Sequence, residues 1–420
     1  MLEILNEEEF NNFSKNNSNS IFFQSSYWGE LKKSTGWNYY LVGYKKEKII
    51  GATILLYKKI PIFNKYIFYA PRGFLIDYSN LELVQNFTNE IAKFVKKKNG
   101  IFFKINPLVL YQQRDTDGNV IENGINNKKL VDYLKKLGYV HTGFSISYGK
   151  DLEPRWISVL KLKGKTKEEI KANYRSTTRW DINYASKHGL ELIEINEDRL
   201  DEFKKLMEHT GSRRGFIDRP LSYYKKMYQE FSKDGFIKVM LVELNIDKNI
   251  EAQELTKNIA IKKLNKEQKK TKPKENLIKE LEKQIESAER KKKENLELKA
   301  KYGEKIVVAG GLFMTFGKQI VSLFGASYKE FMKFKGQYYL NNEMIEYAID
   351  NNYEAYNFYG ITGEFNKESP MYGLFDFKRG FNAEVEELIG EFTYITNRFY
   401  YNIYNIMLYI YRKIKKVIKW

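Results

Sequence analysis

Short apolar runs, separated by polar turns, recur in both halves of the chain and predict β-strands that alternate with amphipathic helices. In the first half, strands are expected at 38–44, 49–57, 66–69, 101–105 and 139–147, with helices at 81–98 and 128–137. In the second half, strands are expected at 238–244, 306–315, 319–326 and 353–359, with a helix at 342–350 and a shorter helix before the last strand. Because the order of elements is similar, the pattern predicts a duplicated α/β module of about 120–150 residues.

Residues 246–301 interrupt this pattern with a segment rich in Lys, Glu, Asn, Gln and Leu. Leu277, Leu281 and Ile285 recur every four positions, as on one face of a helix, and Pro273 breaks the run near its middle. The segment therefore predicts an antiparallel coiled-coil hairpin of two helices, each of about 24 residues and roughly 36 Å long. Its excess of basic residues fits either a solvated spacer or dimer contact, or an arm that grips a nucleic-acid backbone.

A second basic segment, residues 166–187, predicts a single amphipathic helix. Glu169 follows Thr166 by three positions, which is the pattern of a capping box. On such a helix Arg175 and Arg179 lie four positions apart and share one face. They are candidates for binding nucleic-acid phosphates, and the alternative is that both are simply exposed.

Composition and charge narrow the classes of protein. A chain of 420 residues predicts two or three domains, and a net charge of +18 favours polyanionic partners. The absence of Cys excludes a Cys nucleophile and a Cys-based zinc site, and with three His a multi-histidine metal centre is not expected. Without a signal-peptide pattern or an apolar run of transmembrane length, we expect a cytoplasmic protein. The aromatic, basic residues 397–420 favour packing on the first half, with contact to the inner face of an anionic membrane as a second interpretation.

The stretch 359–390 contains the strongest candidate for chemistry, Phe377 followed by Lys378 beside a turn. A lysine has a flexible stem and three donors, so it can reach a phosphate or a developing oxyanion. By spacing alone, the pair also fits a surface lysine beside a core phenylalanine.

Four stretches add a longer pattern: 24–32, 171–194, 209–224 and 357–390. They contain QSSYWGELK, KANYRSTTRWDINYASKHGLELIE, HTGSRRGFIDRPLSYY and NFYGITGEF…GLFDFKRGF…EELIG. In these stretches and in their order, the chain resembles the Fem-type peptidyltransferases, which extend the interpeptide bridge of bacterial peptidoglycan. The hairpin at 246–301 is similar to a helical arm that some members carry.

The resemblance implies an α/β (α+β) fold with two tandem acyltransferase-like (GNAT-like) domains. The first domain would comprise residues 1–150, completed by 391–420, and the second would comprise 151–390 with the arm inserted in it. The implied reaction moves an amino acid from aminoacyl-tRNA, with no other cofactor, to the stem-peptide side-chain amine of lipid II or of its UDP-linked muropeptide precursor. Neither the transferred amino acid nor the oligomeric state follows from the resemblance.

The resemblance also assigns roles to particular residues. It implies that Lys32, Arg219 and Tyr223 hold the phosphates and sugar–peptide part of the acceptor, and that Phe377 and Lys378 lie beside the reacting carbonyl. Arg219 and Tyr223 are four positions apart, so on a helix they would face one site, although Tyr223 also fits a core aromatic. Tyr328, which follows the strand expected at 319–326, is a further pocket candidate.

Asn106 departs from the family pattern, because members often have Asp at this position. If the family's Asp were an obligatory general base, a chain with Asn at this position would be inactive. We expect that it is not obligatory, since an aminoacyl ester is already activated and the reaction needs mainly positioning and charge stabilisation.

Two other functions compete with this interpretation. A CoA-dependent N-acyltransferase of the same fold would need a Gly-rich turn that binds pyrophosphate through backbone N–H groups, and no convincing R/Q-x-x-G-x-G/A run is found. A non-catalytic RNA-binding protein would use the basic arm, and its affinity would fall with salt.

Overall fold

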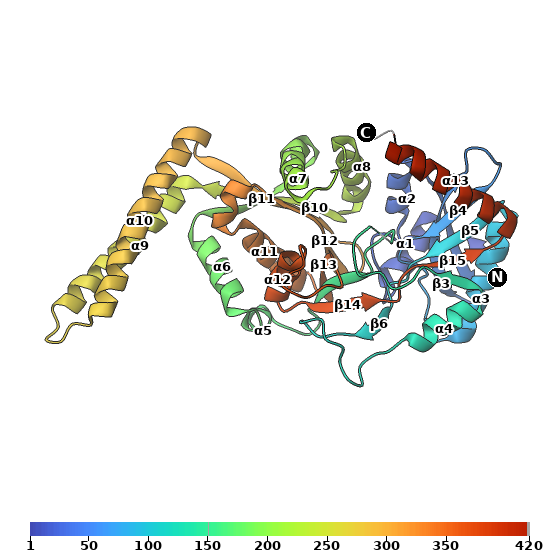
Figure 1. The fold of residues 1–420 in the computed structure, drawn as a ribbon, viewed down its shortest axis with the longest axis horizontal. Helices are drawn as coiled ribbons and strands as arrows, with labels where there is room; N and C mark the ends of the chain where they lie inside the picture. The colour runs from blue at the N-terminus through green and yellow to red at the C-terminus, as the bar shows by residue number, and fades with distance from the viewer. Residues whose placement is uncertain (150, 418–420) are drawn as a thin grey trace.

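The computed structural model describes residues 1–149 and 151–417, which form two β-sheets with helices around them and a long helical arm at one end (Figure 1). The first sheet has seven strands. In spatial order they are β1 (Leu2–Ile4), β2 (Asn38–Lys45), β3 (Ile49–Lys59), β4 (Tyr66–Ala70), β5 (Gly100–Ile105), β15 (Phe392–Ile395) and β7 (Tyr139–His141).

Five helices accompany the first sheet: α1 (Glu7–Asn16), α2 (Ser26–Lys33), α3 (Leu81–Lys97), α4 (Lys128–Lys136) and α13 (Arg398–Val417). Ser25 caps α2, because its side chain accepts a hydrogen bond from the backbone N–H of Trp28. Helix α1 was not predicted, because its apolar face is only Phe10 and Phe13 in a polar segment.

The second sheet has eight strands. In spatial order they are β6 (Leu110–Gln113), β14 (Glu384–Leu388), β8 (Trp156–Lys161), β13 (Ala355–Ile361), β12 (Gln319–Ser327), β11 (Lys305–Met314), β10 (Ile237–Asn245) and β9 (Leu190–Ile195). Strand β6 lies within the range expected for the first domain, yet it pairs with β14.

The strand order repeats between the sheets. β2, β3 and β4 are antiparallel neighbours, and β4 then pairs parallel with β5 after helix α3. β10, β11 and β12 follow the same order, and β12 pairs parallel with β13 after α11 (Gly336–Asp350). The repeated order agrees with the duplicated α/β pattern of the sequence.

The two repeats exchange a strand. β8 follows β7 in the chain but inserts between β13 and β14 of the second sheet. β15 follows β14 but inserts between β5 and β7 of the first sheet. The connecting segments 142–155 and 389–391 therefore both pass from one sheet to the other.

The remaining helices surround the second sheet. They are α5 (Lys167–Ala172), α6 (Ser176–Lys187), α7 (Leu200–Arg214), α8 (Leu221–Phe231) and α12 (Tyr372–Gly380), with short 3-10 turns η1 (Glu197–Arg199), η2 (Ser232–Asp234) and η3 (Lys329–Phe334). One core cluster joins both halves, since Phe22 of the first half lies 6.2 Å from Phe231 of α8, ring centre to ring centre. This core places α2 against α8.

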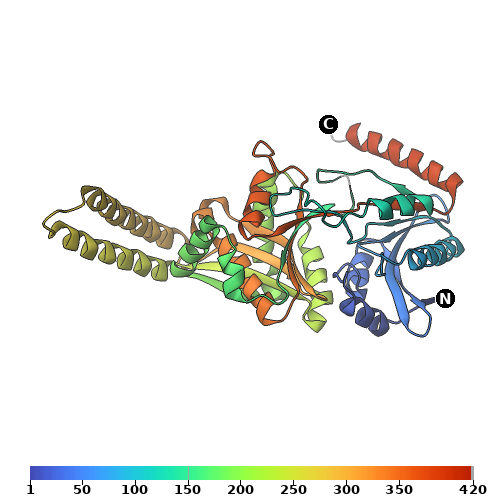
Figure 2. The same ribbon diagram turned by 90° about the horizontal axis from the view of Figure 1, so that it is seen from below.

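The arm consists of α9 (Ile246–Gln268) and α10 (Glu275–Tyr302), which pack side by side and project from the second sheet (Figures 1 and 2). The break between them contains Pro273, as predicted, and α9 has 23 residues. Lysines and carboxylates pair across the hairpin, as in Lys299–Asp247 and Lys292–Glu254. These ion pairs join the two helices of the arm.

Candidate active site

Two residues expected to hold the acceptor, Arg219 and Tyr223, lie where α8 meets α2. Arg219 precedes α8 instead of lying on it, because Pro220 is the N-cap. Its guanidinium carbon nevertheless lies 5.4 Å from the centre of the Tyr223 ring, a cation–π distance. The pair therefore forms without the shared helix face that the spacing suggested.

Lys32, the third predicted acceptor residue, lies in the last turn of α2. Its Nζ is 5.3 Å from the centre of the Trp28 ring. Burial lowers the pKa of Lys32, the charge of Arg219 lowers it further, and Glu153 opposes both. Arg219 and Glu153 thus lie close enough to Lys32 for their charges to influence it.

Glu153, which the sequence did not single out, is the carboxylate at this site. It lies in the connection 142–155, and the hydroxyl of Tyr359 donates a hydrogen bond to it. Burial raises the pKa of Glu153, although Arg72, the Tyr359 hydrogen bond, Lys32 and Arg219 act in the opposite direction. A half-buried carboxylate with a raised pKa among cations is a candidate for accepting a proton.

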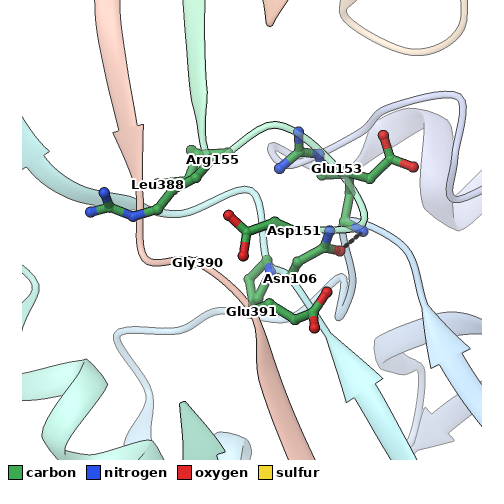
Figure 3. A pocket seen from close by; sticks show the side chains of 9 residues that line it. Asn106, Asp151, Glu153, Arg155, Leu388, Gly390 and Glu391 are labelled. Atoms are coloured by element: carbon green, nitrogen blue, oxygen red, sulfur yellow. Dashed lines mark hydrogen bonds between the residues drawn. The ribbon is translucent and has the colours of Figure 1, made fainter. Parts of the chain in front are cut away.

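Arg72 and Asn106 support the loop that carries Glu153. The Arg72 guanidinium donates to the carbonyl of Pro154 at 2.8 Å. The backbone of Arg72 is in the left-handed region, with φ of 55°, and its N–H donates to Asn106 Oδ1 at 2.7 Å (Figure 3). In this chain the side chain of Asn106 therefore fixes the backbone of Arg72. The carboxylate at the site is Glu153, which belongs to the connection 142–155.

Figure 3 shows a small recess where the two exchanged connections pass each other. Asp151, Glu153 and Arg155 line it from one connection, and Gly390 and Glu391 line it from the other. Ion pairs close it: Arg155 with Glu387, and Lys104 with Glu391. The strand exchange itself therefore positions Glu153 between the sheets.

Lys378 lies on α12 and is buried, with 5% of its surface exposed. Its Nζ donates to the carbonyls of Tyr359 (3.2 Å) and Gly360 (2.7 Å), where the register between β13 and β8 shifts. Burial lowers the pKa of Lys378 to about 7. Lys378 thus reaches Glu153 through Tyr359, whose backbone it holds and whose hydroxyl contacts the carboxylate.

The expected single helix at 166–187 is wrong, because α5 ends at Ala172 and α6 begins at Ser176. Arg175 lies in the break and binds both oxygens of Asp376 at 3.1 Å each. Arg179 donates to the carbonyls of Ala172 and Tyr174. The two arginines therefore do not present one free cationic face, and their predicted contact with nucleic acid stays a prediction.

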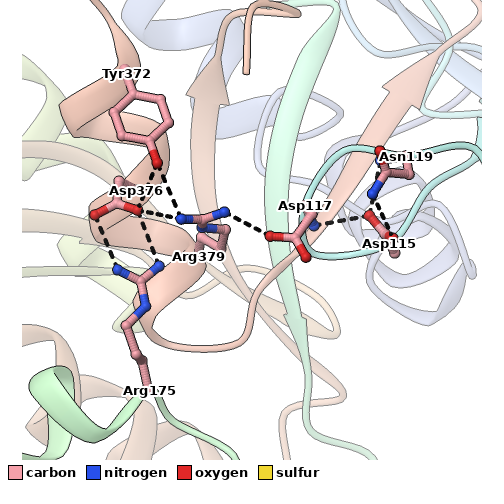
Figure 4. A network of polar contacts seen from close by, with 7 residues as sticks. All are labelled: Asp115, Asp117, Asn119, Arg175, Tyr372, Asp376 and Arg379. Carbon is pink, nitrogen blue, oxygen red and sulfur yellow. Dashed lines mark hydrogen bonds and ion pairs between the residues drawn. The ribbon is translucent and has the colours of Figure 1, made fainter. Parts of the chain in front are cut away.

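Figure 4 shows that Arg175 belongs to a network that fixes α12. Arg379 of α12 donates to Asp376 and to Asp117 of the loop after β6, each at 2.7 Å. Burial raises the pKa of Asp376, but hydrogen bonds from Arg175 and Arg379 outweigh this and leave it lowered. The network anchors the helix that carries Lys378 to segments of both halves.

Two other predicted residues have different surroundings. Phe377 packs against Tyr338 and Phe381, with ring centres 4.9 and 5.3 Å away, within the core under the second sheet. Tyr328 follows β12 and contacts His209, with ring centres 5.1 Å apart. Among the described residues, none of the contacts of Tyr328 is with Lys32, Arg219 or Glu153, so the structure does not place Tyr328 with them.

The residues that were missed had only weak sequence signals. Glu153 and Arg155 flank a proline, and Arg72 lies between Pro71 and Gly73, which indicates turns. Turns carry functional side chains more often than their length suggests, but nothing local showed that these two turns meet.

The buried Lys378 gives a pH-dependent prediction for stability. Its pKa is about 7 in the folded chain against 10.5 for the free side chain, so between these values the unfolded chain holds more protons. The free energy of unfolding therefore gains a contribution from Lys378 as pH rises from about 7, of at most about 1.4 kcal/mol per pH unit. Urea unfolding is measured between pH 6 and 9.5. The free energy of unfolding of the native chain minus that of Lys378→Met should become more positive as pH rises above 7. A constant difference would contradict the lowered pKa.

Comparison with known proteins extends the similarity over nearly the whole chain. The model of the FemAB family matches residues 5–408. An aminoacyltransferase FemA of Staphylococcus epidermidis is 31% identical over 420 residues, covering 98% of this chain and 99% of the relative. An aminoacyltransferase FemA of Staphylococcus aureus (strain N315) is 32% identical over 411 residues, covering 96% and 97%. A crystal structure of FemX superposes with a TM-score of 0.76 and 28% identity, covering 96% of this chain and 99% of that one.

Proposed function

The chain belongs to the FemAB family, and on this premise we propose that it is an aminoacyltransferase that builds the interpeptide bridge of peptidoglycan. The family membership confirms the resemblance inferred from the four sequence stretches. The observation that carries the proposal for the site is the cluster of Lys32, Arg219 and Glu153, which is connected through Tyr359 to Lys378. The cations can bind the phosphates of a diphosphate-bearing acceptor, and the carboxylate can accept a proton from its amine.

The proposed reaction is acyl transfer from an ester to an amine. The side-chain amine of the stem peptide attacks the carbonyl carbon of aminoacyl-tRNA, and a C–N bond forms. The C–O bond to the terminal ribose then breaks, and the ribose oxygen leaves with a proton. The amine loses one proton during attack, and we expect Glu153 to accept this proton and then to pass it to the leaving ribose oxygen. No cofactor other than the aminoacyl-tRNA is needed.

Lys378 is proposed to stabilise the negative charge that develops on the carbonyl oxygen or on the leaving 3′ end of the tRNA. Two of its three donors are used by the carbonyls of Tyr359 and Gly360. Among the described residues no partner takes the third donor, which is therefore free for a substrate oxygen. Phe377 is proposed to keep this lysine at a fixed depth.

We expect Arg219→Ala to weaken binding of a UDP-linked muropeptide roughly 10- to 100-fold, because a hydrogen bond to a charged group contributes about 1.5–3 kcal/mol. Isothermal titration calorimetry measures this directly. The matched control is Arg214→Ala, which removes another exposed arginine, from the last turn of α7. An equal loss in both variants would mean that only general charge matters.

One experiment decides between this function and its alternatives. The protein is incubated with labelled aminoacyl-tRNAs and either the UDP-linked muropeptide or lipid II, and mass spectrometry reports which residue is added. A product with an added amino acid supports the proposal and identifies the substrate. Thermal stabilisation by CoA instead of the muropeptide would favour the CoA-dependent N-acyltransferase. Salt-sensitive binding of tRNA without any transfer would favour the RNA-binding protein.

A further inference from the structure

The aromatic ring contacts of α13 with the first sheet lie on one face of the helix. Tyr401 and Tyr404 contact Phe102 of β5, with ring centres 5.4 and 5.5 Å away. Tyr400 contacts Phe63 in the turn between β3 and β4 at 5.5 Å. These contacts place α13 against β5 and the turn between β3 and β4 of the first sheet, at the opposite end of the molecule from the arm (Figure 2).

The other face of α13 is apolar and exposed. Phe399, Ile406, Ile410 and Ile414 have 68%, 60%, 50% and 51% of their surface exposed. Their spacings of seven, four and four residues place them on one stripe of the helix. A contiguous apolar stripe on a protein surface marks a site of interaction with a protein or a membrane.

The turn between β3 and β4 lies beside the start of α13. Ile62 at its tip is 70% exposed, and its neighbour Phe63 packs on Tyr400 of α13. Lys65 of the same turn lies over the Tyr400 ring at 4.9 Å. The turn therefore adds an apolar side chain and a cation beside the start of the helix.

The charge of this region identifies the partner. Arg412 and Lys413 are exposed on α13, and no acidic residue follows Glu391 in the sequence. A second copy of the chain would meet cations with cations, which opposes a symmetric contact. An anionic lipid surface matches both the cations and the apolar stripe.

We propose that the α13 surface (Ile62, Lys65, Phe399, Ile406, Ile410, Lys413 and Ile414) docks on the face of an anionic lipid bilayer. Among the helices of the described residues, none has the length and apolar composition needed to cross a bilayer, so the contact is peripheral. This inference rests on the proposed function, since it implies that the chain meets a lipid-linked acceptor at the membrane. The stripe inserts at the headgroup level, and the cations attract the anionic headgroups.

The test is flotation of the full chain with vesicles of phosphatidylcholine alone or mixed with phosphatidylglycerol. We expect binding only to the mixed vesicles, and weaker binding at high salt. The double variant Ile406→Asn/Ile410→Asn should reduce binding about tenfold or more, because it removes two apolar side chains from the stripe. Leu255→Asn/Ile259→Asn is the matched control, as these residues are 62% and 45% exposed on α9, also four positions apart.

Each outcome bears on the proposal. Equal binding of the Ile406/Ile410 variant and the native chain, or no binding of the native chain, would overturn it. So would a dimer in light scattering that the same variant dissociates. With the soluble UDP-linked acceptor the variant should transfer normally, whereas with lipid II in vesicles it should be slow. Vesicle binding without any transfer by the native chain would preserve the docking surface and reject the proposed function.

Discussion

Lys378→Met is expected to lower the single-turnover rate constant of aminoacyl transfer about 10²- to 10³-fold, equivalent to about 2.7–4 kcal/mol in the barrier. The ammonium group is buried on α12 and has a pKa of about 7. Its charge is therefore present below pH 7 and lost above it. The rate of the native chain divided by that of the variant should fall as pH rises through 7. Titration of the attacking amine affects both rates equally, so it does not change this ratio.

Acceptor affinity separates a role in the reaction from a general loss of structure. Calorimetry should give similar dissociation constants for Lys378→Met and the native chain, because Lys32 and Arg219 lie on other elements. Lys367→Met, the same substitution at an exposed position in the loop before α12, is the matched control. A variant at position 378 with an unchanged rate constant would remove Lys378 from the mechanism.

Glu153→Gln is expected to lower the transfer rate roughly 10²- to 10⁴-fold, the usual contribution of a positioned general base. The substitution keeps an oxygen for the Tyr359 hydroxyl but cannot accept the proton of the amine. Because burial raises the pKa of Glu153, the native rate should increase as pH rises through that value. The acidic limb of the pH–rate profile should be absent in the variant.

The matched control is Asp151→Asn, which neutralises a second carboxylate of the same recess. Asp151 accepts a hydrogen bond from Ser145, whereas the Tyr359 hydroxyl donates to Glu153, so we expect a small effect on the rate. If Asp151→Asn and Glu153→Gln lowered the rate equally, or if the variant at 153 retained the acidic limb, the proton acceptor would have to be sought elsewhere.

Periodicity predicted most of the elements that pack against one sheet. The strand expected at 49–57 is β3 (Ile49–Lys59), and the helix expected at 81–98 is α3 (Leu81–Lys97). The break at Pro273 separates α9 from α10. Each of these depends on residues two to four positions apart, which the sequence contains directly.

The candidate site was predicted in part. Lys32, Arg219 and Tyr223 were expected together from the resemblance, and the structure places Lys32 near Arg219 and Arg219 over Tyr223. Tyr328 was expected nearby but contacts His209 instead. Residue spacing places side chains on a face of one element, but it does not determine which elements meet.

By itself the sequence determined most strands and helices of the repeated pattern, the helical arm, the basic charge and, through its motifs, the family. The tertiary structure alone decided that β8 and β15 change sheets, that Glu153 meets Tyr359 across 206 residues, and that Arg175 pairs with Asp376 across 201. The physical reason is the range of the interactions. Helix and turn preferences are set by near neighbours, whereas pairings across hundreds of residues depend on the packing of the whole chain, which offsets the entropy lost in closing such long loops.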